Sequence, residues 1–318
     1  MRITIARLAQ DIQAFLVFKH ALGHPYVRGE ATLRSFERFV RQHTGPCSKF
    51  SLETMLNGWL SRIEGRKPVT ITLDLGVIRQ FCLYRRRYEP GSFVPGREWA
   101  PQSTESTFLP YIFSHDEVRQ ILNAASQHHG RNLDGVMLRT LLLILYCTGL
   151  RLGEATRILL KDVNLERNLF TVRHSKGKTR FVPFGDDLAR ELNDYLSWRQ
   201  GIATSPNDGA LLVRLSGDAL PVNVASFAIR QLLRREGLKP AKGRSGPRPY
   251  DMRHTFAVHR LTDWYRQGED IHARLPWLSA YMGHDNVLGT EVYLTATAEL
   301  MALASQRFEQ RLQQAGKK

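Results

Sequence analysis

A segment rich in proline and glycine, residues 89–111, divides this chain into two parts. Its punctuating residues are Pro90, Gly91, Pro95, Gly96, Pro101 and Pro110. Proline lacks a backbone N–H and its ring clashes with the preceding helical turn, so this segment cannot form one continuous helix. The chain has 318 residues, enough for two domains of ordinary size. We therefore predict an N-terminal domain at 1–88, a linker at 89–111 and a C-terminal domain at 112–318.

The part before the linker has the pattern of a helical bundle. Apolar residues at helical spacing between positions 8 and 42 are Ile12, Phe15, Leu16, Phe18, Leu33, Phe36, Phe39 and Val40. Charged residues lie between them, as expected of amphipathic helices. Two further helical stretches follow at 51–64 and 72–87. Segments of this kind pack most simply as a four-helix bundle.

The part after the linker combines helices with a short β-structure. Ser114 and Glu117 form a capping-box pattern that opens a helix. Two β-like runs, at 169–173 and 180–183, flank a turn with the sequence HSKGKT. Further helical patterns lie at 136–146, 186–199, 223–236, 252–266 and 275–282. The predicted fold class is therefore mainly α with a small β-sheet (α+β).

The charge of the chain indicates its partner. A formal net charge of +15 favours a polyanion, because lysines and arginines that neutralise phosphates release counterions. A membrane surface is the weaker interpretation. The longest apolar stretch, around 141–147, is too short to cross a bilayer. The three cysteines, Cys47, Cys82 and Cys147, are far apart and are expected to be reduced thiols. With no secretory signal at the start, we expect a cytoplasmic protein that binds nucleic acid.

Residues suited to chemistry at a phosphate are spread over the C-terminal part. They are Arg151 in TGLRLGE, Lys176 in HSKGKTR, Tyr250 and Arg253 in PYDMRHTF, His284 in MGHDN, and Tyr293 nine positions later. Guanidinium groups stay protonated and can hold two phosphate oxygens, an ammonium can donate a proton, and a phenol can attack phosphorus. Together they are suited to covalent catalysis on a phosphodiester.

In this order the residues resemble the tyrosine recombinases, the phage integrase family of DNA-rearranging enzymes. That family carries an arginine in TGLRxxE, a lysine in a β-hairpin, a helix start HxxRH, the tripeptide LGH and a late tyrosine. Five positions of this chain agree, whereas Tyr250 stands where the family most often has the first histidine of HxxRH. A phenol with an ordinary pKa near 10 is a poor base at neutral pH, although it can still donate a hydrogen bond to phosphate.

The resemblance implies a mechanism and an architecture. An N-terminal core-binding domain and a C-terminal catalytic domain would clamp double-stranded DNA. Tyr293 would attack phosphorus to give a 3′-phosphotyrosyl enzyme, while Arg151 and Arg253 stabilise the phosphate. Lys176 would protonate the leaving 5′-oxygen, and His284 would bind the phosphate or orient the tyrosine. Because the bond energy is conserved, this reaction would need neither a nucleotide cofactor nor a metal.

Other polar residues of the C-terminal part have simpler expected roles. Contacts with DNA phosphates are expected from Lys178, Arg180, Lys239, Lys242, Arg244 and Arg248. Lys178 is also the alternative general acid if the hairpin register shifts by two residues. Glu154 is expected to orient an arginine or to cap a helix. His254 is expected to be a buried, hydrogen-bonded residue of the helix start rather than a catalyst.

The last helical stretch, 298–313, bears on how copies of the chain assemble. One of its faces carries Leu300, Leu303, Ala304, Phe308 and Leu312. In the family that the chain resembles, such a tail docks on a neighbouring protomer, so we expect self-assembly on DNA as a tetramer, alone or with other recombinases.

The expected function is site-specific recombination or integration through a Holliday junction, in the service of a mobile element. Two alternatives share parts of this pattern. A type IB topoisomerase uses the same residue types to relax DNA. A DNA-binding accessory protein that has lost catalysis is the other, and Tyr250 is its sole support.

Overall fold

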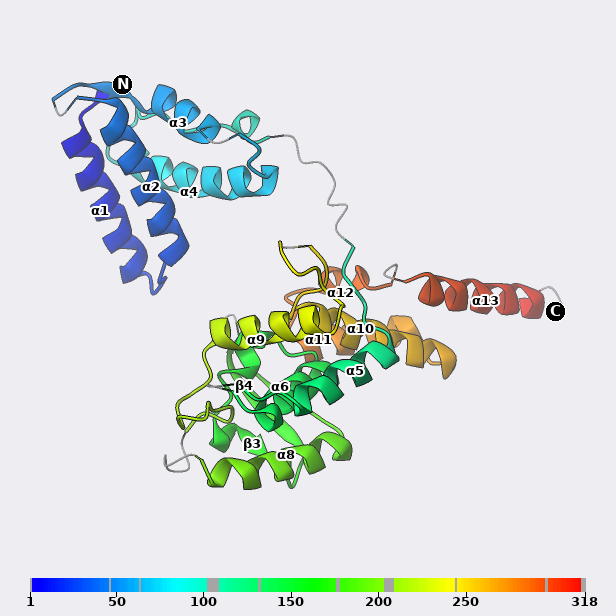
Figure 1. Ribbon diagram of the computed structural model, residues 1–318. Coiled ribbons are helices and arrows are strands. Elements are labelled where there is room, and N and C mark those ends of the chain that lie inside the picture. Colours follow the sequence, from blue (N-terminus) through cyan, green and yellow to red (C-terminus); the bar gives the residue numbers. More distant parts are fainter. Residues whose placement is uncertain are drawn as a thin grey trace. The chain divides into compact units, whose positions relative to one another are not determined.

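The computed structural model describes residues 2–45, 47–62, 64–101, 109–130, 133–175, 178–202, 209–243, 245–294 and 297–315. The chain forms two compact units, divided between residues 107 and 108 (Figure 1). Helices dominate both units and the sheets are small, so the predicted fold class is confirmed. No helix in these described ranges is long and apolar enough to cross a membrane.

The described N-terminal unit is a bundle of four helices, as the periodicity predicts. They are α1 (Ile5–Ala21), α2 (Val27–His43), α3 (Leu52–Ser61) and α4 (Pro68–Arg86). Two short strands, β1 (Arg2–Ile3) and β2 (Phe50–Ser51), pair antiparallel beside them. Leu8, Ile12 and Trp59 are fully buried in the core of the bundle. Pro68 begins α4 at a position where the missing N–H would have no helical partner anyway.

Part of the predicted linker packs on this bundle. The short 3-10 helix η1 (Arg97–Trp99) brings Trp99 edge to face with Phe93, with 5.4 Å between the ring centroids. Both rings pack against the bundle core, and Arg79 of α4 donates a hydrogen bond to the carbonyl of Pro95. The predicted linker at 89–111 therefore begins too early, because these aromatic rings bury apolar surface despite the surrounding prolines. Residues 102–108 lie outside the described part.

The described C-terminal unit holds the remaining elements. Its helices are α5 (His115–Ser126), α6 (Gly135–Thr148), α7 (Leu152–Ala155), α8 (Asp186–Gln200), α9 (Val222–Arg235), α10 (Asp251–Arg266), α11 (Ile271–Met282), α12 (Leu288–Glu291) and α13 (Ala298–Ala315), with the 3-10 helix η2 (Leu160–Asp162). The strands β3 (Val163–Asn164), β4 (Leu169–Ser175) and β5 (Lys178–Pro183) form an antiparallel sheet in that order. The predicted capping box is confirmed, since Ser114 and Glu117 bond reciprocally at 2.7 and 3.1 Å.

Helix α6 is the centre of this unit. Its residues Met137, Leu138, Leu141 and Ile144 are fully buried, and it packs against α5, α8 and α10. A helix that is apolar on most sides has to be enclosed in this way. α6 ends at Gly149, whose backbone is left-handed with φ of +61°. This turn places the following residues, 150 and 151, at the start of α7.

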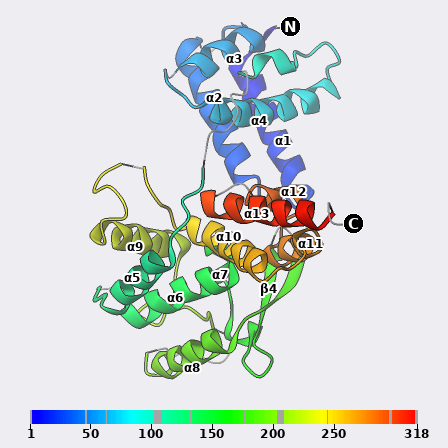
Figure 2. The same cartoon turned by 90° about the vertical axis from the view of Figure 1, so that its right-hand side faces the viewer.

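Helix α10 lies between α6 and the tail helix α13 (Figure 2). A separate apolar cluster joins α10 and α11 to Tyr293 and to Leu300 of α13. Arg307 of α13 donates to the carbonyl of Gly268 at 2.5 Å, and Glu299 pairs with Arg266. The tail therefore packs on its own unit through the face that carries Leu300.

Candidate active site

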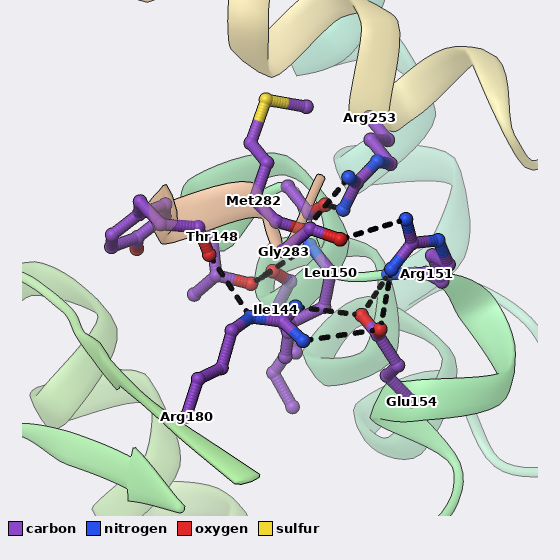
Figure 3. Close-up of polar contacts among 11 residues, drawn as sticks. Ile144, Thr148, Leu150, Arg151, Glu154, Arg180, Arg253, Met282 and Gly283 are labelled. Atoms are coloured by element: carbon purple, nitrogen blue, oxygen red, sulfur yellow. Dashed lines mark hydrogen bonds and ion pairs between the residues drawn. The ribbon is translucent and has the colours of Figure 1, made fainter. Parts of the chain in front are cut away.

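Arg253, on the first turn of α10, ties together the ends of two other helices. Its Nη1 donates to the carbonyl of Gly149 at 2.6 Å and its Nη2 to the carbonyl of Met282 at 2.8 Å (Figure 3). The residue is 1% exposed, and its Nε is buried without a hydrogen-bond partner among the described residues. Burial, together with the charge of Arg151, lowers the pKa of Arg253. The guanidinium still remains charged at neutral pH.

Arg151 lies at the N-terminus of α7 and is oriented by Glu154. Its Nη1 donates to Glu154 Oε1 at 2.8 Å, its backbone N–H to Oε2 at 2.9 Å, and its Nη2 to the carbonyl of Gly283 at 3.2 Å. Burial is the largest single effect and would lower the pKa of Arg151, but the bonded carboxylate of Glu154 and the hydroxyl of Tyr250 together outweigh it and raise the pKa. The expectation that Glu154 orients an arginine is confirmed.

Arg180 of β5 binds the same carboxylate from the other side (Figure 3). Its Nη2 lies 2.9 Å and its Nη1 3.2 Å from the two oxygens of Glu154, and its Nε donates to the carbonyl of Tyr281 at 3.0 Å. The side chain is 13% exposed. The contact of Arg180 with DNA stays a prediction, and the structure speaks against it because the donors of this side chain are engaged inside the protein.

Tyr293 lies just after α12 and is 2% exposed. Its hydroxyl oxygen is 3.1 Å from Nδ1 of His254. Burial raises the pKa of Tyr293 to about 12, although the charge of Arg253 acts in the opposite direction. The phenol is therefore neutral at physiological pH and lies beside two basic side chains.

His254 is the residue whose importance the sequence did not reveal. It is hydrogen-bonded, as expected, and half-buried, and its partner is the hydroxyl of Tyr293. Burial lowers the pKa of His254 to about 4, so the ring is neutral near pH 7. Its Nε2 faces Asp251 Oδ1 at 3.9 Å. The one sequence signal was its position directly after Arg253 and one helical turn after Asp251.

Two further predicted residues border the same cluster. His284 follows the left-handed Gly283, and its Nδ1 lies 2.7 Å from the hydroxyl of Thr290. The rings of His284 and Tyr293 are stacked at 6.3 Å. Tyr250 lies just before α10, is 41% exposed, and helps to raise the pKa of Arg151 through its hydroxyl. The cluster thus unites Arg151, Tyr250, Arg253, His284 and Tyr293.

The remaining predicted residues lie elsewhere or outside the described part. Lys176 and Arg244 are outside the described residues, and Lys178 is described only by its backbone pairing with Ser175. Lys239 is 4% exposed, and its Nζ donates to the carbonyls of residues 245, 246 and 247. The contact of Lys239 with DNA stays a prediction, and the structure speaks against it because the ammonium is engaged by its own loop.

Lys242 and Arg248 keep the exposure that a surface contact requires. Lys242 is exposed. Arg248 is 42% exposed at its side chain, although its Nη2 pairs with Asp251 Oδ1 at 2.8 Å. Their predicted contacts with DNA phosphates remain predictions.

Comparison with known proteins identifies similar chains. Residues 112–299 match the model of the phage integrase family. A relative named as an integrase/recombinase, y4rB of Sinorhizobium fredii, is 32% identical over 95% of this chain and 97% of its own length. The tyrosine recombinase XerC of Staphylococcus aureus is 26% identical over 82% of each chain.

Solved structures have the same fold. The Tn1549 transposon integrase, in complex with transposon right end DNA, superposes with a TM-score of 0.67 at 18% identity and covers 96% of this chain and 100% of that one. The XerH site-specific recombinase, bound to palindromic difH substrate, superposes with a TM-score of 0.65 at 19% identity, covering 88% of this chain and 78% of that one.

Proposed function

Because this chain belongs to the phage integrase family and is a site-specific tyrosine recombinase, we propose that Tyr293 is the nucleophile that attacks a DNA phosphodiester. The observation that carries this assignment is the position of the Tyr293 hydroxyl beside His254, in a cluster that also holds Arg151 and Arg253. A tyrosine that only fills the core of a protein needs no arginines beside it. A tyrosine that attacks a phosphodiester needs fixed positive charge to stabilise the transition state.

The two arginines bind the scissile phosphate in this proposal. Arg151 is held by Glu154 with part of its side chain exposed, 24%, so it can reach a ligand without reorganisation. Arg253 contributes its buried Nε, a donor for which no partner exists among the described residues. A buried N–H without a partner costs free energy, and a phosphate oxygen would satisfy it. His284 supplies a further hydrogen bond to the phosphate.

The reaction exchanges one ester for another. The oxygen of Tyr293 forms a bond to phosphorus, the bond from phosphorus to the 5′-oxygen breaks, and the products are a 3′-phosphotyrosyl enzyme and a 5′-hydroxyl. Lys176 is the proposed donor of the proton that the leaving oxygen takes. Attack by a 5′-hydroxyl from a second duplex reverses the step and joins the exchanged strands in a Holliday junction. Tyr250 donates a hydrogen bond to the phosphate from the exposed edge of the site.

The substrate of this chemistry is double-stranded DNA. The XerH and Tn1549 proteins were solved with DNA, and the net charge of +15 supports the same partner here. We assign the phosphate contacts to Lys178, Lys242, Arg244 and Arg248. The relatives named as integrases favour a mobile element as the biological setting.

Copies of the chain assemble on DNA through the tail in this proposal. A groove of about 900 Å³ is lined by Phe181, Trp264, Trp277 and Tyr281, and Trp277 is 77% exposed. The face of α13 that carries Leu300 packs on its own unit, so it is unavailable to a neighbour. Met301 and Phe308, seven residues apart, are 49% and 63% exposed, although the sequence pattern placed Phe308 on the same face as Leu300. We assign these two side chains, in place of Leu300, to the groove of the next protomer in a tetramer.

A nicked suicide substrate tests the enzymatic assignment. DNA fragments from the genomic neighbourhood of the gene, each with a nick near a candidate site, are incubated with the full chain. We expect a denaturant-resistant protein–DNA adduct, absent with Tyr293→Phe. An adduct that persists in Tyr293→Phe would disprove the assigned nucleophile. Site-independent relaxation of supercoiled plasmid would favour the topoisomerase, and tight binding with no adduct on any fragment would favour the accessory protein.

A further inference from the structure

Three side chains of the site contact one another in sequence, and the last of them is the proposed nucleophile. Asp251 and His254 lie one turn apart on α10, with Asp251 Oδ1 3.9 Å from Nε2 of His254. The other ring nitrogen, Nδ1, is 3.1 Å from the hydroxyl of Tyr293. Both side chains of α10 are well shielded, with exposures of 2% for Asp251 and 13% for His254. A carboxylate, an imidazole and a hydroxyl in this order can activate a nucleophile.

We propose that His254 is the general base that accepts the proton of Tyr293 as the phenol attacks phosphorus. This inference rests on the proposed role of Tyr293 as the nucleophile. It assigns to His254 the proton transfer that Tyr250, which stands at the position of the usual histidine, cannot perform with a phenol.

The proposal requires one particular tautomer of neutral His254. In that tautomer the single ring proton is on Nε2 and faces Asp251, and Nδ1 can accept the proton of the Tyr293 hydroxyl 3.1 Å away. When Nδ1 accepts the phenolic proton, the ring becomes a cation. The nearby carboxylate of Asp251 stabilises that cation, although 3.9 Å is too long for a hydrogen bond.

Burial keeps the ring of His254 neutral before the reaction, and the charges around it are mixed. Arg248 and Arg253 oppose a positive charge on His254, Asp251 favours it, and the rings of Tyr250 and Tyr293 complete the environment. Burial dominates and lowers the pKa of His254 to about 4, while the pKa of Tyr293 is raised to about 12. A free phenolate is therefore not formed in advance, and the proton moves while the new bond to phosphorus forms.

The step is balanced in atoms and protons. The bond between the tyrosine oxygen and phosphorus forms, and the bond between phosphorus and the 5′-oxygen breaks. The phenolic proton passes to Nδ1 of His254, and the 5′-oxygen takes a proton from Lys176. In the reverse attack, the 5′-hydroxyl gives its proton to Lys176, and His254 returns its proton to the oxygen of Tyr293.

Other groups in the site are less suited to this role. Nδ1 of His284 is engaged with the hydroxyl of Thr290 at 2.7 Å, and its ring stacks on Tyr293 with 6.3 Å between centroids. Tyr250 contacts the ring of His254 edge on, with 4.9 Å between centroids, and so helps to hold the base in place.

Single-turnover adduct formation on the nicked substrate tests this inference. We expect His254→Asn and His254→Ala to slow adduct formation by about 100-fold or more, the usual range for loss of a general base. DNA affinity, measured by fluorescence anisotropy, is expected to stay unchanged. Added imidazole should restore the rate of His254→Ala in proportion to its concentration. His259→Asn is the matched control, because His259 is a half-buried histidine of the same helix that bonds Tyr146 at 3.0 Å, away from the site.

A substrate with sulfur at the bridging 5′-position distinguishes the loss of the general base from the loss of the general acid. A thiolate leaves without a proton, so this substrate should restore the rate of Lys176→Ala but not that of His254→Asn. If the sulfur substrate restored the rate of His254→Asn, His254 would be the residue that protonates the leaving group, and the inference would be overturned. An unchanged or faster rate in His254→Asn with the ordinary substrate would also overturn it. An adduct in Tyr293→Phe would instead overturn the proposed function itself.

Discussion

Glu154 and Arg180 form a two-point ion pair, at 2.9 and 3.2 Å, that ties strand β5 to helix α7. The same carboxylate orients Arg151, so the hairpin of β4 and β5 is linked through one buried side chain to an arginine that we propose binds the scissile phosphate. Tyr281, whose carbonyl accepts from Arg180, also lines the groove proposed for the neighbouring tail. The groove, the hairpin of β4 and β5, and Arg151 are therefore connected through the contacts of Arg180 and Glu154.

Arg180→Gln is expected to destabilise the protein without changing its electrostatic contact with DNA. Removing one partner of a buried carboxylate should lower the free energy of unfolding by about 2–3 kcal/mol, measured by urea denaturation. The slope of log Kd against log salt concentration should match that of the parent. Lys242→Gln provides the contrast, because loss of an exposed phosphate contact should reduce the slope by about one. A reduced slope in Arg180→Gln would restore the original prediction of a DNA contact.

Gly149→Ala is expected to damage both stability and catalysis. A left-handed backbone costs a non-glycine residue about 1–2 kcal/mol, and a Cβ here would lie 2.4 Å from the ring of Phe256. The carbonyl of Gly149 also anchors Arg253, so adduct formation should slow. Gly237→Ala is the control, since Gly237 has φ of +73° and open space around its Cβ position. Equal losses in the two variants would show that the contact with Phe256 is unimportant.

Phe308→Ala is expected to separate strand cleavage from synapsis. The site of one protomer is unchanged in this variant, so the adduct on a single nicked site should form at the parental rate. Recombination between two sites should fall by about tenfold or more, as expected from the loss of a buried aromatic contact of about 1.4 kcal/mol or more. Val27→Ala, which removes a side chain that is 73% exposed on α2, should recombine normally. Normal recombination by Phe308→Ala would contradict the tail contact.

The stability of the protein should depend on the protonation of His254. Its pKa is about 4 in the folded protein and near the ordinary 6.5 when unfolded. As the pH falls from about 6.5 to about 4, the unfolded state binds the proton first, so the free energy of unfolding decreases. His254→Asn should remove roughly 1–3 kcal/mol of this decrease, with partial exposure accounting for the range. The measurement is urea denaturation of both proteins at pH 7 and pH 5. If the parent and His254→Asn lose the same free energy of unfolding between these pH values, the predicted shift in the pKa of His254 is contradicted.

Sequence periodicity and motif order determined much of the local structure of this protein, because both are properties of short segments. Amphipathic spacing determined the helices of the bundle, and the capping pattern determined the start of α5. The order of the motifs brought Arg151, Arg253, His284 and Tyr293 into one cluster in the prediction and in the structure. Within a helix or a motif, the relevant neighbours are a few residues away, so the chain itself specifies them.

Only the tertiary structure decided which basic side chains face inward and which groups they meet. Arg180 and Lys239 lie in basic segments that look like solvated surface, yet Glu154 and the carbonyls of residues 245–247 engage their charges. His254 and Tyr293 are 39 residues apart and meet only because α10 packs beside the segment after α12. The physical reason is that the sequence gives only the type of a charged or polar residue. It does not show whether water or a buried protein group forms the hydrogen bonds of that side chain, because the packing of distant segments selects the partner.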